Sequence, residues 1–230
     1  MTQMKWSRYF NRLSTSLDIY DFLSILVDMK KGDTKIKRLR ELARQTGVLH
    51  ARDLAPFGIP RRYLGRLCAE GFLVKTDHGL YMTSGGPETV HIGLAQVAKA
   101  IPKSVVCLLS ALRFHEIGTQ APHQVWIAMD RRSAHPHLAR PKIKVVRFSG
   151  ESLIAGIVEH DIAGVRVRIY NPAKTVADCF KYRNKIGLDV ALEALRETLR
   201  EHKCTVDDLW RYANICRVSK VMRPYMEAMV

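Results

Sequence analysis

Residues 33–83 have the sequence DTKIKRLRELARQTGVLHARDLAPFGIPRRYLGRLCAEGFLVKTDHGLYMT, in which three short helical patterns precede two strand patterns. Asp33 can cap the first free N–H groups of the first helix, and Gly47 can take the left-handed conformation that ends it. The apolar side chains between them recur at helical spacing and predict one buried face. This face consists of Ile36, Leu39, Leu42 and Ala43.

A turn separates the second helical pattern from the third. The second helix, Ala51 to Ala55, is predicted to be short because Pro56 cannot continue a helix. Gly58 and Ile59 form the turn, and a third helix follows over residues 60–70, with a proline at its first position. One face of the third helix is expected to pack on the first helix through Leu64, Leu67 and Cys68.

The opposite face of the third helix is basic. Arg62 and Arg66 lie four residues apart, and with Tyr63 they form an outward stripe near the start of the helix. The early residues of a recognition helix face the edges of the bases, where an arginine can donate two hydrogen bonds to guanine. We therefore expect this helix to enter the major groove of duplex DNA.

Two strands, Phe72 to Lys75 and Leu80 to Thr83, follow the third helix. Gly79 supplies the positive φ that the turn between them needs, and His78 lies at the tip, where a wing meets phosphate or the minor groove. The stretch as a whole predicts a winged helix-turn-helix. The predicted DNA-binding residues are Lys35, Arg52, Arg61, Arg62, Tyr63, Arg66, Lys75 and His78.

Charge supports a polyanionic partner. Residues 35–70 hold nine lysines and arginines against three carboxylates, a net charge of +6, and the whole chain carries +15 with a pI near 9.8. A solvated basic helical domain with no nucleic-acid role is the alternative interpretation. Residues 1–84 carry +7 and residues 85–230 carry +8, so the second part is also a candidate for nucleic-acid contact.

The remaining composition points to a reduced, cytoplasmic protein. A chain of 230 residues can bury a core as one or two domains. Its five cysteines are odd in number and widely spaced without a C-x-x-C pair, which argues against structural zinc and a disulfide framework. No run reaches the ~18 apolar residues of a membrane span, and no secretory signal is apparent at the N-terminus.

Residues 1–34 form an N-terminal extension with a helical pattern. Leu17 to Met29 is apolar on nearly every side, so this helix must be buried in its own chain or against a second copy. The extension therefore leaves room for a homodimer. Asp18, Asp21 and Asp28 argue against a membrane anchor.

Ser84-Gly85-Gly86-Pro87 marks the clearest boundary, between a DNA-binding domain of residues 35–84 and a domain of residues 85–230. The second domain is predicted to be mixed α/β and to end in helices, which makes the fold class α+β. Its predicted helices are Glu88–Ala100, Val105–Ile117, Asn171–Phe180, Leu188–His202, Thr205–Cys216 and Ser219–Met229, the last interrupted by Pro224. Its predicted strands are Gln124–Met129, Ile143–Phe148 and Val165–Tyr170.

Enzyme signatures are scarce. The chain has no G-x-x-x-x-G-K-[ST], no G-x-S-x-G and no H-E-x-x-H. The acid-x-Lys triplets that a metal-dependent nuclease uses occur only in helical or linker context. His135-Pro136-His137 favours a solvated loop over a metal site, and His115 with Asp178 favours core hydrogen bonds over an acid–base pair. We expect no catalytic residue, no metal and no cofactor.

Three segments together resemble one family. Residues 39–83 resemble the N-terminal winged helix of the AbiEi abortive-infection antitoxins. VVCLLSALRFHEIGTQAPHQVWIAM (105–129) and IYNPAKTVADCFKYRNKIGLDVALEALRE (169–197) resemble the C-terminal domain of the same family. The resemblance covers the chain from Leu39 to its C-terminus, and the first 34 residues depart from the usual start of the family.

The resemblance implies an operon pair. The N-terminal domain would repress its own promoter, and the C-terminal domain would neutralise a nucleotidyltransferase-like toxin without a stable complex, as in the type IV scheme. Arg61, Arg62, Tyr63 and Arg66 match the recognition helix of the family. The polar positions of the C-terminal motifs match Ser110, Arg113, Lys174, Asp178, Tyr182, Arg183 and Lys185.

Among these C-terminal positions, Lys174 and Asp178 are expected to be structural. The residues expected to carry antitoxin function are Ser110, Arg113, Tyr182, Arg183 and Lys185. Two other functions stay open at this point. The chain could be a transcription regulator whose C-terminal domain senses a small molecule, or a nuclease that is directed to its target by the DNA-reading domain.

Overall fold

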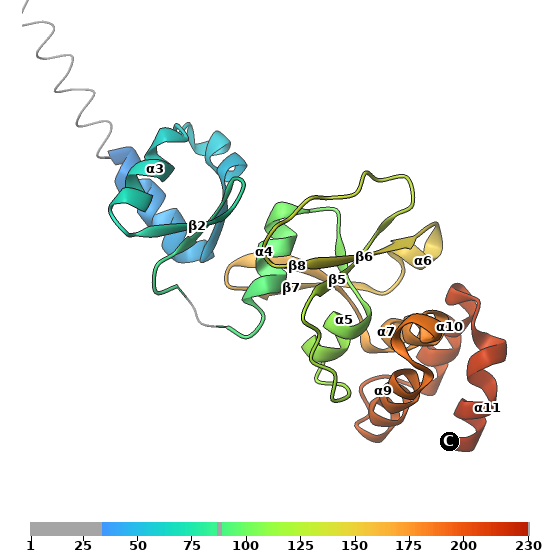
Figure 1. The fold of residues 1–230 in the computed structure, drawn as a ribbon. Helices are drawn as coiled ribbons and strands as arrows, with labels where there is room; N and C mark the ends of the chain where they lie inside the picture. Colours follow the sequence, from blue (N-terminus) through green and yellow to red (C-terminus); the bar gives the residue numbers. More distant parts are fainter. Residues whose placement is uncertain (1–33, 87–88, 230) are drawn as a thin grey trace, which may run out of the picture.

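The computed structural model describes residues 34–86 and 89–229 (Figure 1). The predictions for residues 1–33, including the apolar helix Leu17–Met29 and the Asp33 cap, lie outside the described residues. Among the residues that the structure describes, no helix is both long and apolar enough to cross a membrane.

The N-terminal unit consists of three helices and a small sheet. A helix over residues 34–46 is followed by β1 (Val48–His50), the 3₁₀ helix η1 (Ala51–Phe57), α3 (Arg62–Ala69), β2 (Leu73–Asp77) and β3 (Leu80–Thr83). The strands are antiparallel in the order β1-β3-β2. This succession of elements is that of a winged helix-turn-helix, so the predicted fold of this unit is confirmed.

Local signals in the sequence account for these elements. Gly47, with a φ of 55°, ends the first helix, and its N–H donates to the Ala43 carbonyl at 3.0 Å. Gly79, with a φ of 71°, makes the wing turn. The first helix, the 3₁₀ helix and α3 share one core, which consists of Ile36, Leu39, Ala43, Leu49, Leu54, Ile59, Leu64, Leu67 and Leu73.

The wing strand β2 ends at Asp77 and not at Lys75, and three further details of this unit differ from the prediction. Strand β1 was not predicted, because three residues are too few to show alternation. The second helix is a 3₁₀ helix that continues past Pro56 to Phe57, since a proline this close to the end removes little hydrogen bonding. The helix α3 begins at Arg62 instead of Pro60, although the Pro60 carbonyl already accepts the Tyr63 N–H at 3.1 Å.

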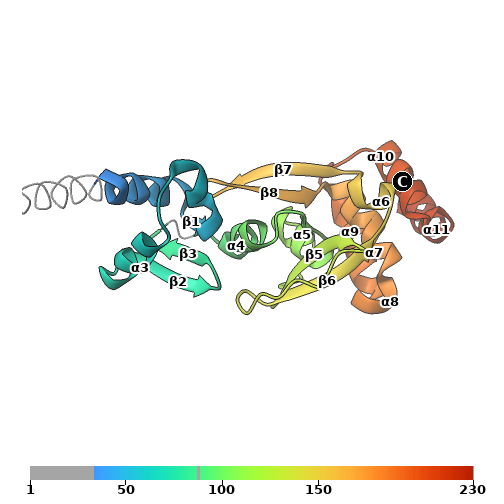
Figure 2. The ribbon, with the colours of Figure 1, turned by 90° about the horizontal axis from the view of Figure 1, so that it is seen from above.

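The C-terminal unit is a mixed five-stranded sheet that ends in a group of helices (Figure 2). Its first part consists of α4 (Ile92–Ala100), β4 (Val105–Val106), α5 (Leu108–Phe114), β5 (Val125–Asp130), β6 (Ile143–Phe148), α6 (Glu151–Ile154), β7 (Ile157–Ile162) and β8 (Val165–Tyr170). The helices that follow are α7 (Pro172–Lys181), α8 (Arg183–Ile186), α9 (Leu188–Arg200), α10 (Val206–Cys216) and α11 (Ser219–Met229).

The strands of this sheet run in the order β6-β5-β4-β8-β7. The β4–β8 and β5–β6 pairs are parallel, and the β4–β5 and β7–β8 pairs are antiparallel. The predicted alternation of β8 is confirmed, since Val165, Val167 and Ile169 are buried. The α+β fold class predicted from the sequence is confirmed as well.

Capping residues start two of the C-terminal helices as predicted. The Asn171 side chain accepts the Lys174 N–H at 2.9 Å, and Pro172 occupies the first helical position of α7. Thr205 and Asp208 form a capping box at the start of α10. These two caps fix where α7 and α10 begin, and the two helices pack against each other.

The prediction for Val105–Ile117 was wrong. This segment is not one helix but the central strand β4 followed by α5, and the chain changes direction at Leu108, whose φ is 46°. A two-residue strand that is buried on both faces has no period that separates it from a buried helix. Strand β7 was missed because its side chains are largely exposed, and α11 continues through Pro224 without interruption.

The two units pack against each other through one apolar cluster. Val48 and Leu80 of the winged helix share it with Leu94 of α4 and with Ile162 and Val165 beside the β7–β8 turn. An ion pair between Lys99 Nζ and Asp53 Oδ2, 2.8 Å apart, crosses the same boundary. Helix α4 therefore holds the winged helix onto the sheet.

A substitution at Gly164, in the β7–β8 turn, tests the packing between the two units. Its φ is 72°, and a Cβ there would overlap the carbonyl oxygen of Gln45 at the end of the first helix. Gly71 has the same φ of 72° but open space around it. We expect Gly164→Ala to lower the free energy of unfolding by about 1–3 kcal/mol more than Gly71→Ala, measured by chemical denaturation. Equal losses would show that the two units do not pack here.

Candidate functional site

The outer face of α3 is basic and accessible. Arg61, Arg62 and Arg66 are exposed, whereas Leu64 and Leu67 are buried against the core of the winged helix. The Arg62 guanidinium lies over the Tyr63 ring, 5.4 Å from its centroid. The two buried leucines therefore fix the rotation of α3 so that its arginines point away from the protein, as the sequence predicts.

Glu70 joins α3 to the first helix. Its Oε1 accepts a hydrogen bond from Arg66 Nε at 3.0 Å, and its Oε2 accepts one from Arg40 Nη2 at 2.7 Å. These hydrogen bonds, from Arg40 and then from Arg66, lower the pKa of the Glu70 carboxyl. Arg66 is therefore held in place by a carboxylate, and Glu70 ties the arginine face of α3 to the first helix.

The first helix adds further positive charge. Lys37, Arg38 and Arg44 are exposed, and the predicted DNA contact Lys35 is half-buried. Two of these arginines rest on aromatic rings: Arg38 lies 5.1 Å from the centroid of Phe57, and Arg44 lies 5.7 Å from that of Phe72. The cations of this helix are thus supported by rings of the neighbouring elements.

The wing is attached to the C-terminal unit at its tip. Asp77 Oδ2 accepts the backbone N–H of Ala139 at 2.6 Å and that of Arg140 at 3.2 Å, and Oδ1 accepts the His78 N–H at 2.6 Å. The hydrogen bond from His78, with those from Arg140 and Ala139, lowers the pKa of Asp77. Lys75 and His78 remain exposed. No local pattern indicates this role of Asp77, because its partners lie more than 60 residues away in the chain.

Arg52 differs from the other predicted DNA contacts. Its guanidinium donates to the Lys99 carbonyl at the end of α4, so the side chain is engaged where the two units meet. Contact with DNA would require it to leave this hydrogen bond. Arg52 belongs to η1 and is not part of the arginine face of α3.

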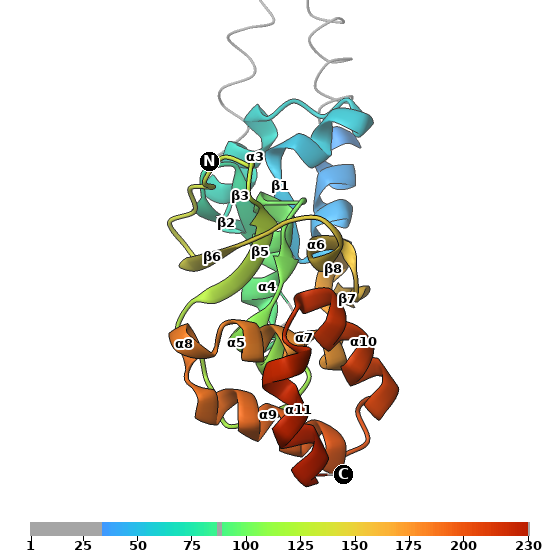
Figure 3. The same cartoon turned by 90° about the vertical axis from the view of Figure 1, so that its right-hand side faces the viewer.

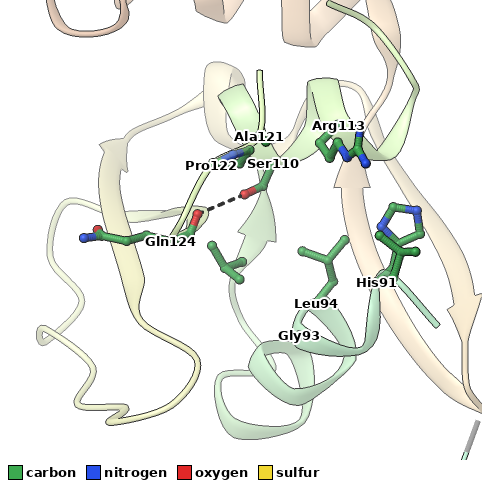
Figure 4. Close-up of a pocket in the computed structure, with 10 residues that line it drawn as sticks. His91, Gly93, Leu94, Ser110, Arg113, Ala121, Pro122 and Gln124 are labelled. Carbon is green, nitrogen blue, oxygen red and sulfur yellow. Dashed lines mark hydrogen bonds between the residues drawn. The ribbon is translucent and has the colours of Figure 1, made fainter. Parts of the chain in front are cut away.

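The predicted antitoxin residues fall into two places in the C-terminal unit. Ser110 is buried: its Oγ accepts the Trp126 N–H at 2.9 Å and donates to the Gln124 carbonyl at 3.4 Å, so it joins α5 to β5 (Figure 4). Arg113 is exposed and lines a small pocket of about 200 Å³, with His91 on the same side (Figure 4). Ser110 thus supports the fold, and Arg113 is the accessible member of this pair.

Tyr182 lies at the junction of α7 and α8, and Arg183 and Lys185 belong to the four-residue α8. Of these three residues only Lys185 is exposed. Tyr182 is half-buried; its hydroxyl donates to the Arg147 carbonyl at 3.0 Å, and burial raises its pKa to about 12. Arg183 Nη1 donates to the Phe180 carbonyl at 2.9 Å and so satisfies the end of α7. Two of the three residues therefore have structural contacts.

Lys174 and Asp178 form an ion pair in the core. Lys174 Nζ lies 2.6 Å from Asp178 Oδ2, and both side chains are 0% exposed. The ammonium lies 4.1 Å from the centroid of Tyr170, and the Cys216 thiol donates to Asp178 Oδ1 at 3.3 Å. Burial raises the pKa of Asp178, and Lys174 opposes this increase. His115 does not reach Asp178; its Nε2 donates to the Tyr170 carbonyl at 2.7 Å.

Two histidines beside Phe114 are expected to make the stability of the fold depend on pH. The rings of His115 and His160 lie 5.2 Å and 4.7 Å from that of Phe114, and burial lowers the pKa of both histidines. A lowered pKa favours the neutral form in the folded chain. The resulting contribution to the free energy of unfolding is fully present at pH values above about 6.5, the ordinary pKa of histidine. It is lost as the pH falls through the pKa values of the two histidines in the folded chain.

We therefore expect the free energy of unfolding to decrease between pH 7.5 and pH 5.5, measured by urea titration. His115→Gln/His160→Gln should make this decrease smaller, because both titrating groups are gone. The exposed His123→Gln is the matched control and should leave the decrease unchanged. A double variant that kept the full pH dependence would contradict this origin.

Comparison with known proteins finds a family model that matches the winged helix and a solved structure with a similar fold. Residues 37–83 match the family model described as "Transcriptional regulator, AbiEi antitoxin". Among solved structures, the RV2827C protein from Mycobacterium tuberculosis is similar with a TM-score of 0.54 and 15% identity, over 85% of this chain and 80% of that chain. At this identity the similarity shows a shared fold. No curated protein sequence matches the chain.

Proposed function

We propose that the chain represses its own operon and neutralises a nucleotidyltransferase-like toxin encoded beside it, because residues 37–83 match the family model of AbiEi transcriptional regulators. Residues 35–84 bind promoter DNA in this proposal, and residues 85–230 act against the toxin without forming a stable complex with it. The chain acts by binding, not by catalysis.

The observation that carries the DNA-binding role is the orientation of α3. Its buried leucines turn Arg61, Arg62 and Arg66 outward, on a unit that matches a family of transcriptional regulators. The first turns of α3 would enter the major groove, where arginine reads guanine, and the wing would lie along the backbone. The residues proposed to contact DNA are Lys35, Arg61, Arg62, Tyr63, Arg66, Lys75 and His78.

Exposure divides the proposed antitoxin residues. Arg113 and Lys185 are accessible and are proposed to act on the toxin or its substrate. Ser110, Tyr182 and Arg183 hold the surrounding backbone through the hydrogen bonds described above, so they are proposed to support function by positioning α5, α7 and α8.

Separation of the two roles in the full chain tests the proposal. The toxin gene and a promoter reporter are expressed with Arg62→Ala/Arg66→Ala or with Arg113→Ala/Lys185→Ala, at matched protein abundance. The first variant should lose repression and keep protection; the second should keep repression and lose protection. Arg166→Ala, at a side chain that is 84% exposed on β8, is the control and should keep both. If Arg62→Ala/Arg66→Ala lost protection against the toxin, the proposed division of roles between the two domains would be contradicted.

A further inference from the structure

The C-terminal unit contains a second concave surface whose lining is strongly cationic. A cavity of about 430 Å³ is lined by residues of β6, which is the edge strand of the sheet, and by residues of α7 and α8. Figure 3 shows how β6 and these two helices are arranged. The cations that line it come from four segments of the chain: Arg131, Lys144, Arg147, Lys181 and Lys185. Its volume is within the range of small-ligand sites, about 300–1,000 Å³.

These cations are not neutralised by the protein. No aspartate or glutamate lines the cavity, and in the part of the chain that the structure describes none of the five cations has a carboxylate oxygen within 4.0 Å. Arg147 uses one N–H on the Asp130 carbonyl, at 2.9 Å, and keeps the rest of its guanidinium. Like charges gathered in a concavity raise the local positive potential and favour an anion.

Aromatic rings form part of the same wall. Trp126, Phe148 and Tyr182 line the cavity, and the centroids of Phe148 and Tyr182 are 5.5 Å apart. The Tyr182 hydroxyl is fixed on the Arg147 carbonyl, and the buried Lys174 ammonium lies 4.8 Å from the Phe148 centroid. Phe148 is only 2% exposed and supports the wall from beneath, whereas Trp126 and Tyr182 are half-buried and can offer a surface to a planar group.

The cations are placed close to these rings. Lys181 Nζ lies 5.7 Å from the centroid of Phe148, and Lys185 Nζ lies 5.6 Å from that of Tyr182. A neighbouring cavity of about 380 Å³ shares Lys181 with this one and continues to Arg217 at the end of α10. Glu151 also lines this neighbouring cavity, so the cations beyond the rings there are Lys181 and Arg217 beside one carboxylate.

We propose that this cavity binds nucleotides, with phosphates on Lys144, Lys181 and Arg131 and a base against the aromatic wall. Stacking of bases on aromatic side chains beside a basic groove is how proteins bind single strands without regard to sequence. The ligand is either a free nucleoside triphosphate or a nucleotide unit of a single strand. The site is distinct from α3, which lies at the other end of the molecule (Figure 2), and the proposal does not depend on DNA reading by α3.

Calorimetric titration of the full chain at low salt tests the site. The probes are ATP, GTP, inorganic tripolyphosphate and a ten-nucleotide oligothymidylate. We expect ATP or the oligonucleotide to bind more tightly than tripolyphosphate, because only they carry a base. The tighter of the two identifies the source of the ligand. Lys144→Ala/Lys181→Ala, at two exposed side chains, should weaken binding of that probe at least tenfold.

Two control variants make the outcome decisive. Lys103→Ala/Arg166→Ala removes the same number of exposed cations outside the cavity and should change the affinity less than twofold. Arg62→Ala/Arg66→Ala should bind the probe normally even where promoter binding is lost. The proposal is overturned if no probe binds, if tripolyphosphate binds as tightly as both base-bearing probes, or if the Lys103→Ala/Arg166→Ala control loses as much affinity as the cavity variant.

Discussion

Arg62→Ala and Arg66→Ala should each weaken binding of the full chain to its promoter by roughly 1–3 kcal/mol, which corresponds to about 5- to 150-fold in Kd. Both side chains are exposed on the face of α3 that its buried leucines turn outward. Each can donate two hydrogen bonds to one guanine. Competition assays with a labelled promoter duplex measure the loss.

The same variants measured on random duplex DNA separate two explanations. If the arginines read bases, the loss should be large on the promoter and small on random DNA, since phosphate contacts carry no sequence information. Equal losses on both duplexes would mean that the arginines contact only phosphate. Arg166→Ala is the control for a simple loss of charge, because this exposed arginine belongs to β8 and not to α3.

Lys174→Met should destabilise the C-terminal unit by about 3–5 kcal/mol, because it leaves the Asp178 carboxyl in the core without its cation. Burial already raises the pKa of Asp178, and removal of the nearby ammonium should raise it further, so the carboxyl should be neutral in the variant. The loss of stability is measured by chemical denaturation of the full chain, monitored by a spectroscopic signal that comes from the C-terminal unit.

The double variant Lys174→Met/Asp178→Leu is the matched control. It removes both charges, so it should recover much of the stability that Lys174→Met loses, and replacement of a whole buried pair is often neutral. Its promoter binding should equal that of the wild type, because the pair lies outside the winged helix. A loss below about 1 kcal/mol for Lys174→Met alone would show that the ion pair is not a structural element.

Sequence reasoning was most accurate where a structure depends on neighbours in the chain. Gly47, the Asn171-Pro172 cap and the Thr205–Asp208 box act through hydrogen bonds within a few residues, and each occurs as predicted. Strands β1 and β4 were missed because they are only three and two residues long and depend on distant partners. Their pairing with β3, β5 and β8 is a property of the whole fold.

The same difference applies to the candidate sites. The outward direction of Arg62 and Arg66 follows from the spacing of Leu64 and Leu67 within one helix, so it could be predicted. The Arg52 contact with Lys99 joins residues 47 positions apart, and no local pattern indicates it. The cationic cavity likewise gathers side chains from separate segments, and only Tyr182 and Lys185 in it had been singled out.

The central claim is that α3 presents its arginines to a DNA groove. The most direct measurement is fluorescence anisotropy of the full chain with the duplex from its own upstream region, at several salt concentrations. We expect a complex at low ionic strength that prefers this duplex to a scrambled one. Its affinity should fall with a log–log slope of about −0.9 per neutralised phosphate. No complex at low ionic strength, or equal affinity for the scrambled duplex, would contradict the claim.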